Sequence, residues 1–410
     1  MAGTPGSPGT PGTPGTPRVL RAMNDRAALD LLIEHGPLSR TRIGKLTGLS
    51  KPTASQLLAR LEAAGLVLAT GTTDGRPGPN AQLYAVNPAA AYVAGLDVTT
   101  ERIRAAVADI TGRVAGWFEL ATPGRGRRGQ GGAVELVVQA VDGAVKAAGL
   151  HRTDLHRIVV GTPGAFDPST GRLRYASHLP GWHSPTLLDE LAAALPVPLE
   201  YDNDVNLAAV AEQRLGAARD HDDFVLLWNE EGIGAAIVIG GRLHRGWTGG
   251  AGEVGFMPVP GTPLVRHVAK ANAGGFQELA GCNAVLRVAR ELGLTVPRGT
   301  QAEGASALLA AAAETGEGAH AELLRRFATG LAVGLASLVT VLDPELIVLA
   351  GGVIAAGGEP LRSLVQSELA ELAVPRPRLV LGGVPDDPVL SGALQSALAT
   401  TRDEVFDTSR

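Results

Sequence analysis

Residues 202–209 read Asp-Asn-Asp-Val-Asn-Leu-Ala-Ala, a polar cluster followed by an apolar run that one asparagine interrupts. Carboxylates and amides suit a ligand with many hydroxyls, because each can accept or bridge two hydroxyl groups. The same residues also suit an ordinary polar turn, in which Asp and Asn side chains bond to nearby backbone groups. Taken alone, the stretch favours the polar turn, and only the sequence on either side can favour ligand binding.

Alternating strands and helices surround this stretch. The predicted elements are an apolar hairpin (93–98 and 103–109), a helix (133–148), a buried strand (158–161), a helix (about 319–340) and a second buried strand (345–349). Roughly 320 residues of this alternation suit two packed α/β lobes. We therefore expect a two-lobed α/β domain over residues 88–402.

A different pattern precedes this domain, over residues 18–87. It predicts, in order, a helix ending at His35-Gly36-Pro37, a helix capped by Ser39, a turn at Gly48, a helix capped by Ser50, and strands at 66–68 and 82–86. The loop between the two strands is dense in Gly and Pro. Helix, helix, turn, helix and two-stranded wing is the order of a winged helix-turn-helix domain.

The charge distribution follows the same division. The chain as a whole has a net charge of −5, but residues 18–86 carry nine basic and five acidic side chains, a net of +4. The part from residue 87 onward carries 27 basic and 36 acidic side chains, a net of −9. Chance clustering can produce such a difference. It is also typical of a basic DNA-binding module joined to an acidic domain that binds small molecules.

The third predicted helix of the basic module supplies candidate DNA contacts. Leu57, Leu58 and Leu61 share the face that turns to the core, which leaves polar and basic side chains on the other face. A helix fits the major groove, where such side chains reach base edges and phosphates. The predicted contacts are Ser50, Lys51, Thr53, Ser55, Gln56 and Arg60, with Arg76 at the wing tip placed for the minor groove. The alternatives are a solvated helix face for each residue and a packing or dimerisation role for the module.

The ends of the chain and its composition set further limits. Residues 1–17 repeat Thr-Pro-Gly without charge and are expected to form a disordered tail, and residues 403–410 are expected to form a C-terminal tail. The first residues are neither basic nor apolar, which excludes a signal peptide. Cys282 is the single cysteine, and no apolar run reaches the roughly 18 residues that span a bilayer. A cytoplasmic protein without a membrane segment is therefore expected.

Six motifs, in a fixed order, resemble those of the ROK family, which contains bacterial sugar kinases and sugar-responsive repressors. They are 160–164 (VGTPG), 179–182 (LPGW), 202–209 (DNDVNLAA), 232–235 (GIGA), 249–255 (GGAGEVG) and 342–353 (LDPELIVLAGGV). Gly75-Arg76-Pro77 and the strand at Leu83 resemble the wing of the family's repressors. The resemblance implies an α/β fold of the two-lobed, actin-like or ribonuclease-H-like sugar-kinase type, preceded by the winged helix-turn-helix domain.

Two departures from the family pattern argue against catalysis. Kinases of the family carry Asp-x-Gly-Gly-Thr, whose glycines let the backbone approach ATP phosphates, whereas this chain has Asp97-Val98-Thr99-Thr100. The family's zinc element has a His where this chain has Phe256, and its cysteines are absent from residues 273–278. Cys282 and His267 cannot supply the four ligands that a structural zinc needs. No catalytic residue, cofactor or metal is therefore expected.

The sugar-binding floor of the family is retained. The resemblance implies that Asn203 and Asp204 bind sugar hydroxyls, with Asp204 a vestigial form of the kinases' general base. The predicted ligand contacts are Asn203, Asp204, Glu253, Glu278 and Gly164. Phe256 stands where the family has a histidine, so the cavity wall beside Glu253 lacks the two ring nitrogens that could form hydrogen bonds. The ligand is therefore expected to differ from the family's usual hexoses or to be bound without one normal contact.

These observations predict a ligand-responsive transcriptional regulator, a repressor. It would bind double-stranded operator DNA as a homodimer or higher homo-oligomer and sense a sugar or sugar derivative without phosphorylating it. One alternative is a bifunctional ATP-dependent sugar kinase of the ROK family, which Asp204 favours and the altered phosphate turn opposes. A second is a regulator with a vestigial pocket that responds to a protein partner, which Phe256 favours.

Overall fold

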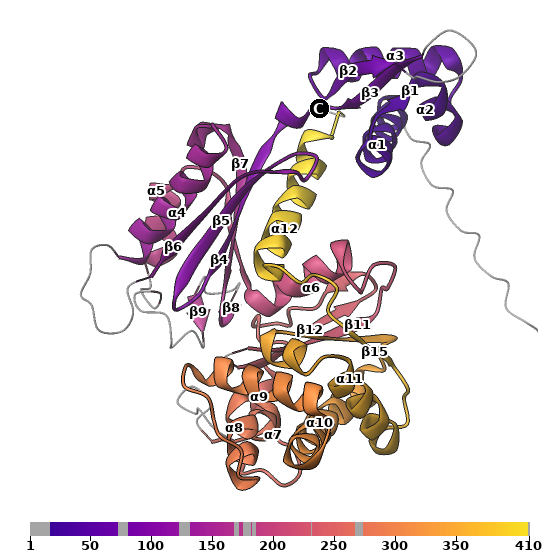
Figure 1. Ribbon diagram of the computed structural model, residues 1–410. Helices are drawn as coiled ribbons and strands as arrows, with labels where there is room; N and C mark the ends of the chain where they lie inside the picture. Colours follow the sequence, from indigo (N-terminus) through magenta and orange to yellow (C-terminus); the bar gives the residue numbers. More distant parts are fainter. Residues whose placement is uncertain are drawn as a thin grey trace, which may run out of the picture. The chain divides into compact units, whose positions relative to one another are not determined.

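The computed structural model describes residues 17–72, 81–122, 132–167, 172–174, 182, 186–230, 232–266 and 274–408. These residues form two compact units, each described by itself below (Figure 1). Unit 1 contains the described residues up to Tyr92, together with Ala108–Arg113 and the residues from Leu398 onward. Unit 2 contains Val93–Val107 and the residues from Val114 to Ala397.

Unit 1 has the predicted winged helix-turn-helix architecture. Its elements are α1 (Pro17–His35), β1 (Leu38–Ser39), α2 (Arg40–Thr47), α3 (Lys51–Ala63), β2 (Val67–Thr72), β3 (Gln82–Val86) and the short helix η1 (Pro88–Ala90). The three strands form an antiparallel sheet in the order β1-β3-β2. The two-residue strand β1 was not predicted, because it exists only through its pairing with Leu83 and Tyr84.

Local hydrogen bonds explain where the helices of unit 1 begin. Ser39 Oγ accepts from Arg42 N at 3.3 Å, and Ser50 Oγ accepts from Thr53 N at 3.4 Å. Gly48 ends α2 in the left-handed region (φ 72°), which only glycine adopts without cost. The predicted caps and turn are therefore confirmed. Helix α1 begins earlier than expected, at Pro17, a residue that suits the first turn of a helix.

The end of the chain belongs to the core of unit 1. Phe406 is only 1% exposed and packs in the same apolar cluster as residues of α1, α2 and α3. The Arg26 guanidinium lies 5.9 Å from the centre of its ring and forms an ion pair with Asp403 at 2.7 Å. Thr408 Oγ1 donates to Asp25 Oδ2 at 3.0 Å. The prediction of a C-terminal tail over 403–410 is therefore wrong for the residues described, up to 408.

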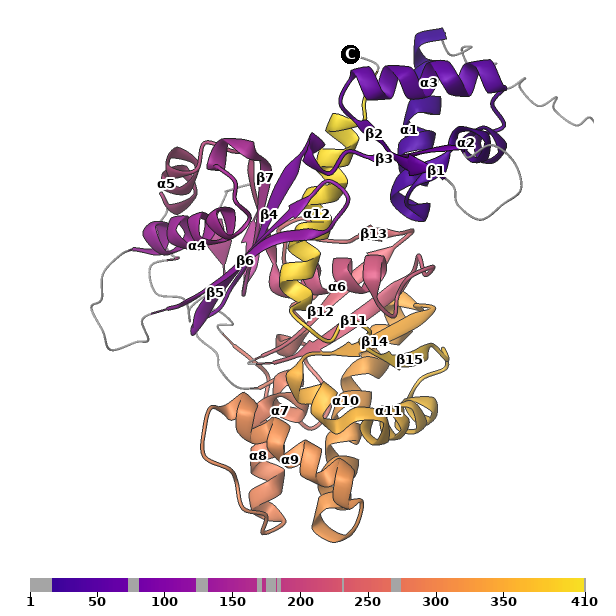
Figure 2. The same cartoon turned by 45° about the horizontal axis from the view of Figure 1, so that its top comes forward.

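Unit 2 contains two five-stranded sheets. The first has the order β10-β7-β4-β5-β6, formed by β4 (Tyr92–Val98), β5 (Arg102–Asp109), β6 (Val114–Ala121), β7 (Leu155–Thr162) and β10 (Leu199–Asn203). Helices α4 (Ala133–Ala147) and α5 (Leu187–Ala194) lie on one side of it (Figures 1 and 2). β10 runs parallel to β7, with Asn203 opposite Thr162, so both strands end at the same edge. The short pair β8 (Ala165–Asp167) and β9 (Arg172–Arg174) follows β7.

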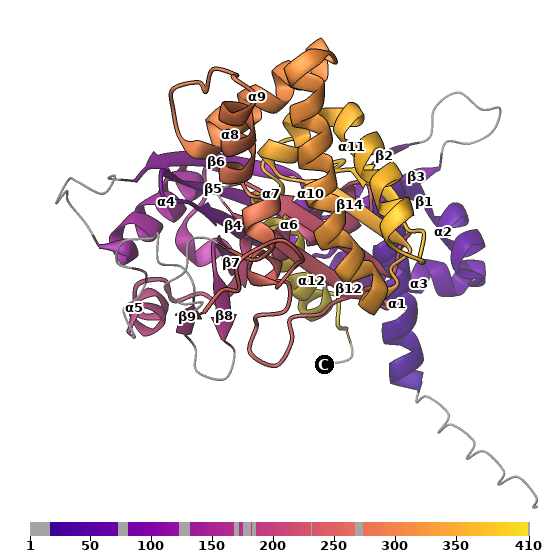
Figure 3. The same ribbon diagram turned by 90° about the horizontal axis from the view of Figure 1, so that it is seen from below.

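The second sheet has the order β13-β12-β11-β14-β15. Its strands are β11 (Phe224–Asn229), β12 (Ile233–Ile239), β13 (Arg242–Leu243), β14 (Leu346–Ala350) and β15 (Arg378–Leu381). The helices of this half are α7 (Phe276–Ala280), α8 (Cys282–Glu291), α9 (Gln301–Thr315), α10 (Gly318–Leu342) and α11 (Gly352–Leu372). Figure 3 shows that these helices lie close together. Helix α6 (Asp204–Leu215) follows β10 and packs on β12, and α12 (Pro388–Val405) closes the chain. The two sheets with their helices confirm the predicted two-lobed α/β class.

Helix α10 is a notable apolar element of unit 2. Among the described helices, this one is long and apolar enough to cross a membrane by length and composition, and half of its most apolar window is buried inside the protein. Leu323, Phe327, Leu331 and Leu335 of α10 lie in an extensive apolar core of unit 2. The sequence predicted this helix at about 319–340 but showed no membrane-length apolar run, because Gly, Thr and Ser interrupt it. Its place in the core accounts for its composition.

Candidate functional site

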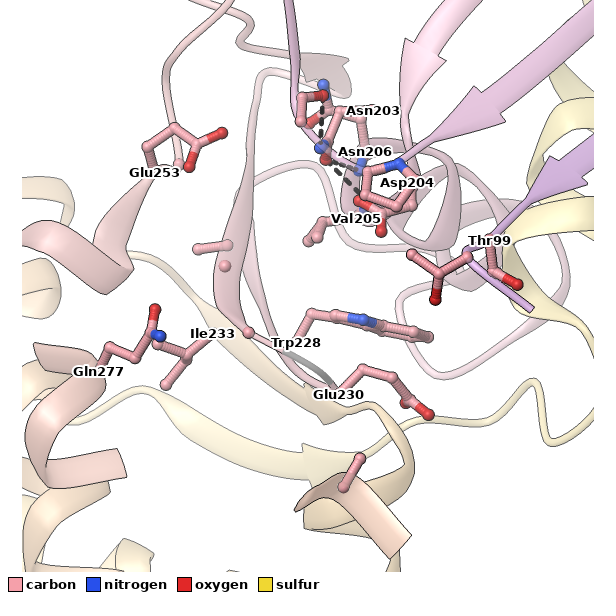
Figure 4. Close-up of a pocket in the computed structure, with 18 of the residues that line it drawn as sticks. Thr99, Asn203, Asp204, Val205, Asn206, Trp228, Glu230, Ile233, Glu253 and Gln277 are labelled. Carbon is pink, nitrogen blue, oxygen red and sulfur yellow. Dashed lines mark hydrogen bonds between the residues drawn. The ribbon is translucent and has the colours of Figure 1, made fainter. Parts of the chain in front are cut away.

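A cavity of about 490 Å³ opens in unit 2. It is bounded by the β4–β5 turn, the residues after β7, the start of α6, the β11–β12 turn, the segment before η3 (Val254–Phe256), and the first turns of α7 and α9. The side chains of Asn203, Asp204 and Glu253 lie on one side of it, with Trp228 and Gln277 among those further across (Figure 4). Four of the five predicted ligand contacts therefore meet at one cavity: Gly164, Asn203, Asp204 and Glu253.

Asn203 both lines the cavity and caps α6. Its Oδ1 accepts from Val205 N at 2.9 Å and from Asn206 N at 3.2 Å, and its Nδ2 donates to the Gly164 carbonyl at 3.0 Å (Figure 4). The polar turn considered as an alternative is thus present, and the same residue still faces the cavity. An amide NH₂ carries two donors. The second N–H of Asn203 is the group it can offer to a ligand.

Asp204 begins α6 beside Asn203. Burial raises the pKa of its carboxyl to about 7, the N–H of Val205 lowers it, and the carboxylates of Asp97 and Glu253 raise it. Burial also raises the pKa of Glu253. Two carboxyls that share a cavity can accept hydroxyl hydrogen bonds when ionised or donate one when protonated.

The position of Glu253 depends on the glycine that precedes it, Gly252. Gly252 has φ 94°, and a Cβ there would lie 1.9 Å from the Ala235 carbonyl oxygen, so no other residue fits. Ala235 N in turn donates to the Gly252 carbonyl at 2.9 Å, which fixes this segment along β12. Phe256 lines the cavity close by, as the sequence predicted for the wall next to Glu253.

Glu278 is a correction to the predicted set, because the cavity is lined by its neighbour Gln277 instead. The Glu278 carboxylate accepts from Gly274 N at 3.3 Å and lies 3.9 Å from the Arg287 guanidinium. Consecutive residues of a helix point in directions about 100° apart, so only one of the two can face the cavity. The motif predicted that this segment lies at the site, but it could not predict which side chain of the short helix α7 faces the cavity.

The β4–β5 turn leaves few amides for a phosphate group. The Thr99 hydroxyl accepts from Glu101 N at 3.4 Å and from Arg102 N at 3.2 Å, and Thr99 N donates to the Arg102 carbonyl. These amides are bonded within the turn, where a phosphate-binding loop would present them to the ligand. Thr99 and Thr100 both line the cavity.

Two cavity residues that sequence reasoning missed belong to the end of β11 and the β11–β12 turn. Trp228 presents its indole to the cavity, and Glu230 lies beside it (Figure 4). Glu230 Oε2 accepts from Gly352 N at 2.6 Å, across 122 residues of sequence. The start of α9 adds Thr300, Glu303 and Ser306. These residues carry no local signal, since only the packing of the two halves of unit 2 brings them to one cavity.

The described candidate DNA contacts lie on α3 of unit 1 or, for Ser50, at its N-cap. Lys51 and Gln56 are exposed, as are Ser50 and Thr53, whose hydroxyls are 2.8 Å apart. Ser55 is half-buried and donates to the Lys51 carbonyl at 2.9 Å.

Arg60 has a structural partner that the sequence did not show. It is exposed, but its Nη2 donates to Asp25 Oδ1 at 2.6 Å, and the Asp25 side chain is only 4% exposed. This ion pair joins α3 to α1, so Arg60 contributes to the packing of unit 1. Arg76 lies outside the described residues. A basic and polar face of α3 remains as the candidate DNA interface, centred on Lys51 and Gln56.

A metal site was not expected. Among the residues that the structure describes, no group of three or more His, Cys, Asp or Glu side chains is placed to hold a metal ion. Cys282 is buried and donates to the Glu230 carbonyl at 2.7 Å, while His267 lies outside the described residues.

Comparison with known proteins agrees with this division. The chain matches the ROK family over residues 93–399 and the MarR family over residues 23–77. It is 25% identical over 340 residues to a xylose repressor of Caldicellulosiruptor bescii, covering 81% of this chain and 83% of that protein. It is 28% identical over 298 residues to a glucokinase of Halalkalibacterium halodurans, covering 70% of this chain and 87% of the glucokinase.

A solved structure shares the whole architecture. It is the crystal structure of a ROK family transcriptional regulator, a homologue of the E. coli MLC protein, with a TM-score of 0.71 and 20% identity. The likeness covers 92% of this chain and 96% of that one, and it concerns the fold. Because the ROK match extends over most of the chain, from residue 93 to residue 399, this protein belongs to the ROK family.

Proposed function

We propose that this protein is a sugar-responsive transcriptional repressor. Unit 1 binds double-stranded operator DNA through α3 and the wing, and the cavity of unit 2 binds a sugar or sugar derivative without phosphorylating it. The observation that carries the proposal is the contrast within one cavity. Asn203, Asp204 and Glu253 offer a polar floor for hydroxyls, while Thr99 binds the amides that a phosphate would need.

Residues across the cavity also disfavour a nucleotide. Among the described residues, the charged side chains that line the cavity are Glu101, Arg102, Asp204, Glu230, Glu253 and Glu303, which is one cation against five acidic groups. Phosphoryl transfer depends on positioning and on charge stabilisation at the phosphates, which needs cations, metal ions and free amides. A neutral polyol makes no such demand, so the lining fits a sugar better than ATP.

A second candidate function is a sugar kinase that also binds DNA. It is favoured by Asp204, because a carboxyl with a pKa of about 7 is well suited to take a proton from a sugar hydroxyl. Two measurements on one sample separate the candidates: release or tightening of operator DNA, and ATP turnover with the same sugar. Genome-wide mapping of bound DNA would supply the operator. Turnover on the order of 1 per second or faster would overturn the proposal in favour of the kinase.

We propose further that the protein acts in the cytoplasm as a homodimer. A single winged module makes few base contacts, and two-fold pairing on a palindromic operator is the common remedy. Light scattering with and without operator DNA tests this, and a monomer in both conditions would contradict it.

Replacing Gln56 or Lys51 by Ala should weaken operator binding without unfolding unit 1, because both side chains are exposed. Gln56→Ala is expected to cost about 1–3 kcal/mol and to relax the preference at one base pair. Lys51→Ala is expected to weaken all sequences alike and to reduce the salt slope of binding by about 1. Fluorescence anisotropy with labelled operator at several salt concentrations measures both effects.

The matched control for these variants is Lys146→Ala, which removes an exposed lysine from α4 of unit 2. It should bind the operator as the parent does. If Gln56→Ala and Lys51→Ala also bind like the parent, α3 is not the DNA-reading helix.

Sugar binding should strengthen as the pH rises towards 7. Ligand hydroxyls that donate to Asp204 favour its ionised form, and below its pKa of about 7 the carboxyl is protonated. The affinity should therefore fall by up to about tenfold for each pH unit below 7 and level off above it. Calorimetry from about pH 5.5 to 8.5 measures this dependence. Glu278→Gln, which alters a carboxylate outside the cavity, should keep the parental profile, and a flat parental profile would exclude Asp204 as the acceptor.

A further inference from the structure

An ion pair between residues outside the cavity lining joins the two sheets of unit 2. Arg245 Nη2 donates to Asp202 Oδ2 at 2.6 Å, and its Nε donates to the same oxygen at 3.2 Å. Asp202 belongs to β10 of the first sheet, and its side chain is 10% exposed. Arg245 follows β13 of the second sheet and is half exposed. Neither side chain is part of the cavity lining.

Asp202 accepts hydrogen bonds from two residues that line the cavity. Its Oδ1 accepts from Asn203 N and from Asn206 Nδ2, each at 2.9 Å. Asn203 and Asn206 both line the cavity. The carboxylate therefore uses one oxygen for the floor and the other for Arg245.

Arg245 directly precedes a segment, residues 246–253, that contributes to the lining of the cavity. Gly249, Ala251, Gly252 and Glu253 of this segment line the cavity. Its two ends are tied to β12, since His244 N donates to the Ile237 carbonyl at 2.7 Å and the Gly252 carbonyl accepts from Ala235 N. Four of the eight residues from 246 to 253 are glycine, so the segment loses much chain entropy when it is ordered. An anchor at its start, such as Arg245, therefore limits the positions that Glu253 can take.

We propose that Arg245 is a positioning residue of the sugar site: its ion pair with Asp202 holds segment 246–253 against the floor, so that Glu253 faces Asn203 and Asp204. The pair acts on the ligand only through these residues. The proposal rests on the proposed function in that it names a further residue for the same site. A guanidinium that gives two N–H groups to one buried carboxylate holds its position better than a lysine ammonium, which is a point charge on a flexible stem.

The first experiment follows hydrogen exchange of the sugar-free full-length protein. Ala251 N donates to the Arg245 carbonyl at 3.2 Å and Glu253 N to the Gly250 carbonyl at 3.4 Å, so both amides report on the segment. In Arg245→Ala and in Asp202→Asn these amides should exchange at least about tenfold faster than in the parent. The matched control is Arg242→Ala, which removes an exposed arginine three residues earlier and should leave them unchanged.

The second experiment measures binding of D-xylose and D-glucose by calorimetry and stopped flow. For a sugar that the parent binds, Arg245→Ala should raise the dissociation constant about tenfold, mainly through faster dissociation. Arg245→Lys should recover part of the loss, and the double variant Asp202→Asn/Arg245→Ala should be little worse than either single variant.

Unchanged exchange in Arg245→Ala, or equal effects of Arg245→Ala and Arg242→Ala, would overturn the role of Arg245. The exchange experiment needs no sugar, so it decides this proposal by itself. Absence of binding for a wide sugar panel in the parent would count against the proposed function instead.

Discussion

Replacing Asp204 by Asn is expected to abolish the effect of the sugar on operator binding while DNA affinity stays near the parental value. The reason is that Asp204 lies in the cavity of unit 2, whereas the candidate DNA contacts lie on α3 of unit 1. Hydrogen bonds to a charged group contribute about 1.5–3 kcal/mol. Loss of the carboxylate should therefore lower the affinity for the sugar roughly ten- to a hundredfold. The measurement is operator binding by anisotropy, titrated with sugar, for parent and variant.

The stability of the same variant distinguishes a lost ligand contact from a folding defect. Burial holds the pKa of Asp204 at about 7 in the folded protein, against 3.8 in an unperturbed carboxyl. Between these values the folded protein binds one proton more than the unfolded chain, so the contribution of Asp204 to stability falls as pH rises from about 4 to 7. Asn cannot ionise, and its Oδ1 can still accept from Val205 N. Asp204→Asn should therefore melt at a higher temperature than the parent above pH 7, and an unchanged sugar response in this variant would rule out the proposed site.

Replacing Phe406 by Ala is expected to unfold or loosen unit 1 and so to remove operator binding. The side chain is 1% exposed and packs against the core of the helix-turn-helix, and loss of a buried phenyl typically costs about 3–5 kcal/mol. Removal of the ring also deprives the Arg26 guanidinium of its aromatic neighbour. Hydrogen exchange of α1 and α3 amides, together with operator affinity, measures the effect.

Phe406→Leu is the matched variant, because it keeps most of the apolar volume and should retain most of the DNA affinity. Sugar binding in unit 2 should survive in both variants, since none of the cavity residues belongs to unit 1. Normal α1 protection and normal DNA affinity in Phe406→Ala would show that the end of the chain is dispensable to the DNA-binding unit.

The sequence alone determined those features whose hydrogen bonds span a few residues. The caps at Ser39 and Ser50 bond to amides three residues ahead, and the turn at Gly48 depends on one backbone angle. The polar cluster at 202–204 is of the same kind, because Asn203 caps the helix that follows it. The order of the motifs then indicated that Asn203, Asp204 and Glu253 would share a cavity, because motifs in that order imply the fold of the family.

Only the tertiary structure decided what depends on contacts between distant parts of the chain. The strand at Leu38 exists because β3 pairs with it, and Phe406 is buried because the α1–α3 core receives it. The rotation of α7 selects Gln277 over Glu278, and Glu230 finds its partner Gly352 across 122 residues. The partners in such a contact are far apart in the sequence, and their relative positions do not follow from the spacing of residues along the chain. No local pattern of hydrophobicity, charge or capping can therefore encode the contact.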